Sequence, residues 1–238
     1  MGMWILATLA AFYVKGLCGF ANTLVFTSIL GFGTNNIAIS PVEVVLGYPT
    51  NIILTWKNRK ELNKKVWVPL ALLVLAGSIP GALFLKNVDA TLIKIIFGII
   101  VVLLSIEMFL REEKAIQIKE SKGVLGFIGI LSGIMCGLYG VGALLAAYIG
   151  RVTDSSSGFK ANISAVFIVE NTFRMILYGV LGIITVSGME HSLMLFPFAL
   201  VGLFLGMKSS SFLNEKTAKR LVIIFLAISG IAMVVTNL

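Results

Sequence analysis

Gly133-Ile-Met-Cys-Gly-Leu-Tyr-Gly-Val-Gly142 is a glycine-dense run inside a long apolar segment, residues 123–150. A weaker copy, Gly16-Leu-Cys-Gly-Phe-Ala-Asn-Thr23, lies near the N-terminus, and each copy holds one of the two cysteines of the chain. Glycine weakens a helix, and irregular backbone is tolerated inside a bilayer only where protein or a polar cavity covers it. The two runs therefore predict a membrane protein built twice, with one broken helix in each half.

The composition also indicates a membrane protein. Of 238 residues, 58% are hydrophobic and only 13% are charged, and the mean hydropathy is +1.01. Soluble domains carry roughly 25% charged residues. The net charge of +8 comes from Lys and Arg in short loops, where positive charge sets membrane orientation, so it does not indicate a nucleic-acid partner.

Six apolar segments can form spanning helices, because a helix needs about 20 residues to cross a bilayer. The segments 3–14 and 19–33 are too short to cross, and 123–150 is long for one crossing. The predicted spans are residues 38–56, 66–85, 92–110, 161–187, 192–207 with its flanks, and 219–236.

The charged loops decide between two topologies. If every apolar stretch crosses once, the loop cations divide nine against seven between the two sides. If 3–33 and 123–150 are re-entrant hairpins, the division becomes fifteen against one, which the positive-inside rule favours. We therefore expect an all-α integral membrane protein with six spans, two re-entrant helical hairpins and both termini outside. Eight simple transmembrane helices are the alternative.

This topology makes the two halves inverted repeats, because each half crosses the membrane three times. The first repeat is residues 1–110 (hairpin 3–33, spans 38–56, 66–85 and 92–110), residues 111–122 are a cytoplasmic linker, and the second repeat is residues 123–238 (hairpin 123–150, spans 161–187, 192–207 and 219–236). Asn51 matches Asn171 and Gly81 matches Gly202 at nearly the same offset as the two cysteines. Inverted repeats with broken helices are typical of transporters, with the substrate site near the midplane. The alternative is that apolar helices resemble one another by composition.

Arg174 lies near the middle of a predicted span, where an ionisable residue is costly and is a functional candidate. It could neutralise an anionic substrate. Glu170 lies four residues earlier on the same helix face, so an internal ion pair is the alternative interpretation. Both hold if Glu170 titrates during transport, and a desolvated carboxylate can take up a proton. Glu170 is thus the candidate for proton coupling.

Three further polar side chains are candidates for the site. Asn51 and Asn171 form a symmetric pair that could bind an oxyanion from both sides, or could hydrogen bond between helices. Lys15 lies at the expected tip of the first hairpin. It supplies a second cation if the tip reaches the midplane, and it extends to the headgroups if the hairpin is shallow.

The glycine runs predict lining residues as well. The free N–H groups and positive dipole end of a half-helix attract anions, which makes Asn22, Thr23, Tyr139 and Gly140 candidates. The alternative is close helix packing by small residues. We interpret Glu43 as structural, because Ser40-Pro-Val-Glu43 has the form of a capping box. No metal cluster, nucleotide loop or catalytic triad is visible, so we expect no enzyme, metal or cofactor.

The paired glycine-rich hairpins, the polar helix after each, and the motifs Gly81-Ala-Leu-Phe-Leu and Gly202-Leu-Phe-Leu resemble the TauE/SafE family of sulfite exporter-like permeases. The resemblance covers nearly the whole chain. It implies transport of small anions, typically sulfite, sulfonates or other organosulfur acids, across the bacterial cytoplasmic membrane. The first repeat departs from the family pattern with Asn22-Thr23 where more glycine is common. The second has Gly140-Val-Gly142 without the proline that often follows.

We therefore expect a secondary transporter of a small anion that works by alternating access, with proton coupling as an option. The partners are the anionic substrate and the lipid bilayer, and a homodimer is left open. The alternative is a passive channel for anions or another small solute. A membrane scaffold or an intramembrane enzyme subunit is disfavoured, because the chain shows neither a soluble binding loop nor a catalytic cluster.

Overall fold

The computed structural model describes residues 1–238 except 32, 35, 88, 114–121, 141, 154, 211–219, 221–222, 225–226, 229, 233 and 236–237. Every regular element over the described residues is a helix, so the prediction of an all-helical protein is confirmed. Residues 114–121 of the predicted linker 111–122 and eight of the 18 residues of the predicted span 219–236 lie outside the described residues. The elements are α1 (Gly2–Cys18), α2 (Asn22–Leu30), α3 (Asn36–Lys57), the short 3-10 helix η1 (Arg59–Glu61), α4 (Lys64–Asn87), α5 (Ala90–Glu113), α6 (Lys122–Tyr139), α7 (Ala143–Val152), α8 (Ser156–Val180) and α9 (Val186–Ser209).

Four of these helices are long and apolar enough to cross a membrane, namely α3, α4, α8 and α9. Shorter apolar helices include α1 and parts of α5 and α6. Large apolar side chains such as Phe84, Phe127 and Leu193 face outward, which suits a surface covered by lipid. The chain is therefore a multi-pass membrane protein.

Two predicted boundaries are wrong. The predicted span 161–187 ends early, because α8 stops at Val180 and Gly182 turns the chain with a φ of 70°. The second boundary is the start of the span predicted at 192–207: α9 already begins at Val186, where the Thr185 side chain caps the helix by accepting a hydrogen bond from the Gly188 N–H. Hydropathy does not locate this helix start, because Thr185 and Gly188 lower the hydropathy of the surrounding apolar sequence only slightly.

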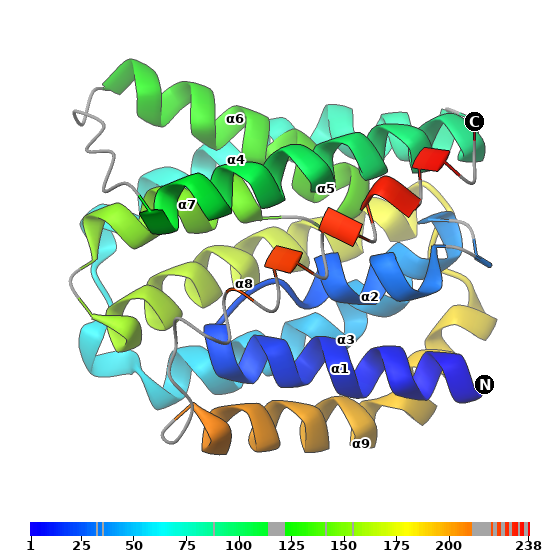
Figure 1. The fold of residues 1–238 in the computed structure, drawn as a ribbon, viewed down its shortest axis with the longest axis horizontal. Helices are drawn as coiled ribbons and strands as arrows, with labels where there is room; N and C mark the ends of the chain where they lie inside the picture. Colours follow the sequence, from blue (N-terminus) through cyan, green and yellow to red (C-terminus); the bar gives the residue numbers. More distant parts are fainter. Residues whose placement is uncertain are drawn as a thin grey trace.

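The helices pack in a pattern that joins distant parts of the chain. Figure 1 shows α1 beside α9 at one edge and α4 with α6 at the other. Between these pairs, α3 packs against α8, while α8 also contacts α4 and α3 also contacts α9. Helices α3 and α8 therefore form the centre of the bundle, and the functional candidates that they carry are covered on several sides.

Glycines set how closely the paired helices approach. A Cβ on Gly133 would overlap the Val74 carbonyl oxygen, and it would lie 2.8 Å from the Gly77 Cα. The same holds in the other pair, where a Cβ on Gly206 would overlap the Tyr13 carbonyl oxygen. For these glycines the structure supports the alternative of close packing by small residues, rather than a lining role.

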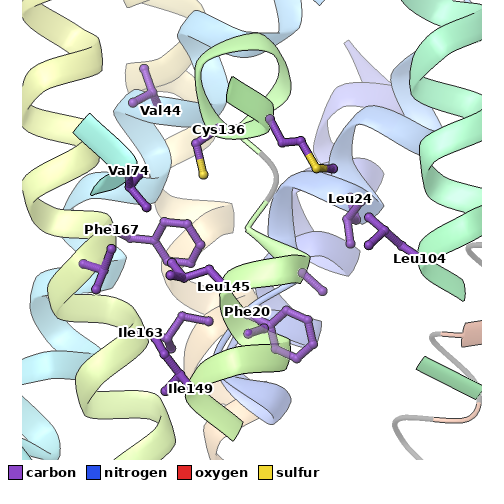
Figure 2. Close-up of a cluster of buried hydrophobic side chains, with 14 of the residues drawn as sticks. Phe20, Leu24, Val44, Val74, Leu104, Cys136, Leu145, Ile149, Ile163 and Phe167 are labelled. Carbon is purple, nitrogen blue, oxygen red and sulfur yellow. The ribbon is translucent and has the colours of Figure 1, made fainter. Parts of the chain in front are cut away.

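The apolar core surrounds the region where α6 ends and α7 begins. Figure 2 shows Cys136 of α6, Leu145 of α7 and Phe167 of α8 pointing into one cluster with Phe20 and Leu24. This packing holds the two broken helices against α8, the helix that carries Arg174.

Candidate functional site

Two breaks in the helices define the site. Break 1 separates α1 from α2, and its backbone is left-handed at Gly19 (φ 87°) and at Ala21 (φ 69°). A left-handed conformation costs a non-glycine residue roughly 1–3 kcal/mol, so the surrounding packing must hold Ala21 in place. Break 2 separates α6 from α7 and begins with Gly140 at a φ of 71°. The breaks meet at a cavity of about 10 Å³, lined by Phe20, Ala21, Asn22, Thr23, Leu24, Gly140, Gly142 and Phe167.

Arg174 of α8 lies beside these breaks and is 1% exposed. Its Nη2 donates to Glu43 Oε2 (3.1 Å) on α3 and to Asn171 Oδ1 (3.0 Å) on its own helix. Its Nη1 donates to the carbonyl oxygen of Cys136 (3.0 Å) on α6. Its Nε lies 3.2 Å from Glu170 Oε1. The guanidinium thus contacts three helices, and the expected pair with Glu170 is accompanied by a second carboxylate.

Arg174 also satisfies the end of α6. The last carbonyl groups of a helix have no partner within it, and they carry the negative end of the dipole. The Cys136 carbonyl accepts from Arg174 and from the Gly140 N–H (2.7 Å), while the Gly137 carbonyl accepts from the Tyr178 hydroxyl (2.8 Å). Two side chains of α8 therefore position break 2.

Glu43 accepts hydrogen bonds from three side chains, and it is 2% exposed. Its Oε1 accepts hydrogen bonds from Asn22 Nδ2 (2.6 Å) and Thr23 Oγ1 (2.7 Å), the first two residues of α2. Its Oε2 accepts from Arg174. Glu43 therefore links the helix after break 1 to the guanidinium beside break 2.

The capping interpretation of Glu43 is wrong. Helix α3 begins at Asn36, so Ser40 and Glu43 lie inside the helix rather than at its first turn. The signal that could have identified Glu43 was its position within the predicted span 38–56, where an acidic residue is a functional candidate. The local motif offered a competing explanation, and only the earlier helix start removes it.

Glu170 is completely buried but poorly hydrogen bonded. Neither of its carboxylate oxygens accepts a hydrogen bond from the described residues, although Oε1 forms the ion pair with Arg174. Removing a carboxylate from water costs several kcal/mol, and one ion pair without hydrogen bonds offsets this cost only in part. The two carboxylates at Arg174 therefore have different environments.

Lys15 lies in the last turn of α1, before the break rather than at its tip, and is 1% exposed. Its Nζ donates to the Gly47 carbonyl oxygen over 3.4 Å and lies 5.7 Å from the centre of the Phe12 ring. A Cβ on Gly47 would lie 3.2 Å from Glu43 Oε1 and 3.3 Å from Asn171 Nδ2. The structure thus places this cation next to the same cluster, and not at the headgroups.

The structure treats the two predicted asparagines differently. Asn171 contacts Arg174, whereas Asn51 is buried and its Oδ1 accepts no hydrogen bond from the described residues. Gly140 adjoins the cluster, because a Cβ there would overlap Arg174 and lie 2.8 Å from Glu43 Oε2. The Tyr139 side chain lies outside the described part of the chain.

A larger cavity of about 280 Å³ opens at the end of the bundle where α3 and α9 finish and α8 begins. Lys160 reaches from its rim to the end of α1 and to break 1, because its Nζ lies 3.5 Å from the Gly16 carbonyl oxygen and a Cβ on Gly19 would lie 2.7 Å from its Cγ. The lining residues are Leu17, Leu54, Lys57, Asn58, Ser156, Ser157, Lys160, Met207 and Ser210. Two lysines and several hydroxyls make this opening suitable for an anion. Among the residues that the structure describes, no group of His, Cys, Asp or Glu could hold a metal ion.

The family comparison agrees with the resemblance noted from the motifs. The model of the family described as Sulfite exporter TauE/SafE matches residues 4–233, which is nearly the whole chain. No curated protein and no solved structure matches the chain.

Proposed function

The chain belongs to the TauE/SafE sulfite exporter family, whose members are membrane transporters, and from this premise we propose that it is a secondary transporter of a small anion. The substrate class is sulfite, a sulfonate or another organosulfur acid, and the membrane is the bacterial cytoplasmic membrane. Transport follows alternating access, in which the site opens to one side at a time.

The observation that carries this proposal is the buried Arg174 at the meeting point of the two breaks. A guanidinium binds oxyanions with directed hydrogen bonds, and in the described structure it donates to two side chains and one backbone carbonyl. The side chains of Asn171, Asn22 and Thr23 add two amides and one hydroxyl within the same cluster. A desolvated cation with replaceable ligands is suited to binding an anion.

Burial favours a carrier over a channel. Arg174 and Glu43 are almost inaccessible, and the cavity between the breaks holds about 10 Å³, roughly the space of one water molecule. An open pore would expose its selectivity groups to water. The 280 Å³ cavity with Lys57 and Lys160 supplies an access path on one side, and opening toward Arg174 requires movement at break 1.

The charge balance supports proton coupling. The buried Lys, Arg, Asp and Glu side chains among the described residues are Lys15, Glu43, Glu170 and Arg174, which together have no net formal charge. A bound monovalent anion would leave one uncompensated negative charge, which a proton could neutralise. Glu170 is the candidate because no hydrogen bond from the described residues stabilises its charged form.

The test is the thermal stability of the purified protein with sulfite, thiosulfate, taurine, sulfoacetate, sulfate and acetate, followed by flux into liposomes. A ligand of the folded state raises its apparent stability. We expect a selective shift for a sulfur oxyanion that is lost in Arg174→Ala, together with the flux. The exposed Arg59→Ala is the matched control, because it removes the same charge at a surface position, and it should keep both.

Arg174→Ala leaves two buried carboxylates without their partner and can fail to fold, since breaking a buried pair costs roughly 3–5 kcal/mol. Arg174→Lys keeps the charge but loses the planar fork. It should bind the same anion at least tenfold more weakly. Wild-type affinity and flux in Arg174→Lys would refute the role of Arg174. Separately, anion flux through the wild-type protein far above carrier rates would favour a channel over a transporter.

A further inference from the structure

We propose that Glu43 is an internal ligand that occupies the place of the substrate anion, so that a substrate binds by displacing its carboxylate from Arg174. This inference rests on the proposed transport function and goes beyond it, because it assigns the anion's position and its hydrogen-bond donors. The site in the described structure would then be filled by the protein's own carboxylate.

The donors around Glu43 are those that an oxyanion would need. Asn22 Nδ2 and Thr23 Oγ1 bind one oxygen at 2.6 and 2.7 Å, and Arg174 Nη2 binds the other at 3.1 Å. Each of these groups is at least nine-tenths buried. The guanidinium is only a donor, and the amide NH2 and the hydroxyl each have a hydrogen to donate. Together these groups can bind a charged group that presents two oxygens.

The position of Glu43 separates it from an ordinary structural ion pair. It joins α3 to α2 and to α8, so its three hydrogen bonds connect one of the broken helices to the central helix. Glu170 provides the contrast, because it pairs with Arg174 within one helix and accepts no hydrogen bond from the described residues. Removing Glu170 would release no donor except the guanidinium Nε, whereas removing Glu43 would release three.

The backbone around the carboxylate limits what can replace it. A Cβ on Gly140 would lie 2.8 Å from Glu43 Oε2, and a Cβ on Gly47 would lie 3.2 Å from Oε1. The carboxylate therefore sits between two glycines without side chains. The ligand that fits these donors and this space is a small, singly charged oxyanion, such as a carboxylate, a sulfonate or hydrogen sulfite, and a large headgroup would not fit.

The experiment measures thermal stability of the purified protein against acetate and methanesulfonate, with chloride at equal ionic strength as the reference. Glu43→Ala should unfold at a lower temperature than wild type without anion. Acetate or methanesulfonate should restore its stability saturably, with a half-saturating concentration at least tenfold below that of wild type. Glu170→Ala is the matched control, since it also removes a buried carboxylate from Arg174, and its half-saturating concentration should change less than that of Glu43→Ala.

Glu43→Gln is measured in parallel because it keeps the volume of the side chain, removes its charge and replaces one acceptor oxygen with an NH2 donor. It should also bind methanesulfonate at least tenfold more tightly than wild type, even where Glu43→Ala does not fold. If wild type binds the anions and neither Glu43 variant binds them more tightly, the inference is overturned while the transport proposal stands. If no anion changes the thermal stability of the wild type or of any variant, the anion site itself is refuted, and the inference falls with it.

Discussion

Arg174 and Glu170 stand out in the sequence because each interrupts an apolar span with a charge. Hydropathy alone therefore selects them, together with Lys15, and the structure brings all three to one buried cluster. Glu43 escapes this selection, because Ser40 and a proline before it form a local motif with a simpler explanation. Local motifs mislead where a helix begins earlier than the motif suggests, as α3 does. The binding roles of these residues stay predictions.

At the same scale, Glu170→Gln tests proton coupling. The substitution keeps the shape of a completely buried side chain and removes the charge that faces Arg174 Nε. If Glu170 carries the proton, the variant should still exchange anions across liposomes, but proton movement recorded by an internal dye should fall at least tenfold relative to anion flux. An unchanged ratio of protons to anions would assign the proton to another group.

The broken helices show what an element contributes beyond its residues. Glycines within an apolar segment predict a broken helix, yet the glycines in and directly after α6 have two different structural roles, close packing and chain reversal. Gly133 and Gly137 allow α6 to approach α4, while Gly140 ends the helix with a left-handed backbone next to Arg174. Spacing cannot separate these tasks, because both require a residue without a Cβ. Only the neighbouring helix decides which glycine packs and which one turns.

Gly133→Ala and Gly126→Ala form a matched pair for the packing role. A Cβ on Gly133 would overlap the backbone of α4, whereas a Cβ on Gly126 in the same helix meets nothing within 4 Å. Overpacking of a tight interface costs about 1–3 kcal/mol, so Gly133→Ala should lower the melting temperature of the purified protein. Gly126→Ala should leave it unchanged or raise it, because alanine favours a helix by about 0.5–1 kcal/mol over glycine. Equal melting temperatures would contradict the interface.

For the whole molecule, the helix contacts follow a pattern that recurs in the two halves, while the inversion of one half relative to the other stays a prediction. With an offset of about 120 residues, α1 corresponds to α6 and α4 to α9. The contact of α1 with α9 then becomes the contact of α6 with α4, and the contact of α4 with α8 becomes that of α9 with α3. The ends also agree with two hairpins, since Lys57 lies beside Met207, and Trp4 stacks on His191. Both chain ends lie at the same end of the helices, on the right of Figure 1.

Labelling with a membrane-impermeant maleimide tests this topology. The native cysteines Cys18 and Cys136 are buried, so the unmodified chain serves as the blank. With two hairpins, Lys60→Cys and Ser210→Cys should be labelled only from the cytoplasm, and Asp89→Cys and Ser187→Cys only from outside. With eight simple crossings, positions 60 and 210 would lie on opposite sides, and that result would exclude the hairpin topology.

The sequence by itself determined that the protein lies in a membrane, that it is helical and which family it belongs to. These follow from hydropathy, charge placement and glycine spacing, which are properties of short segments. The tertiary structure decided which polar groups meet. Glu43 and Arg174 are 131 residues apart, and their contact depends on α3 and α8 packing at the centre while two breaks bring Asn22 and Gly140 beside them. A hydrogen-bond network depends on atom positions fixed by the packing of several helices, and no single segment contains that information.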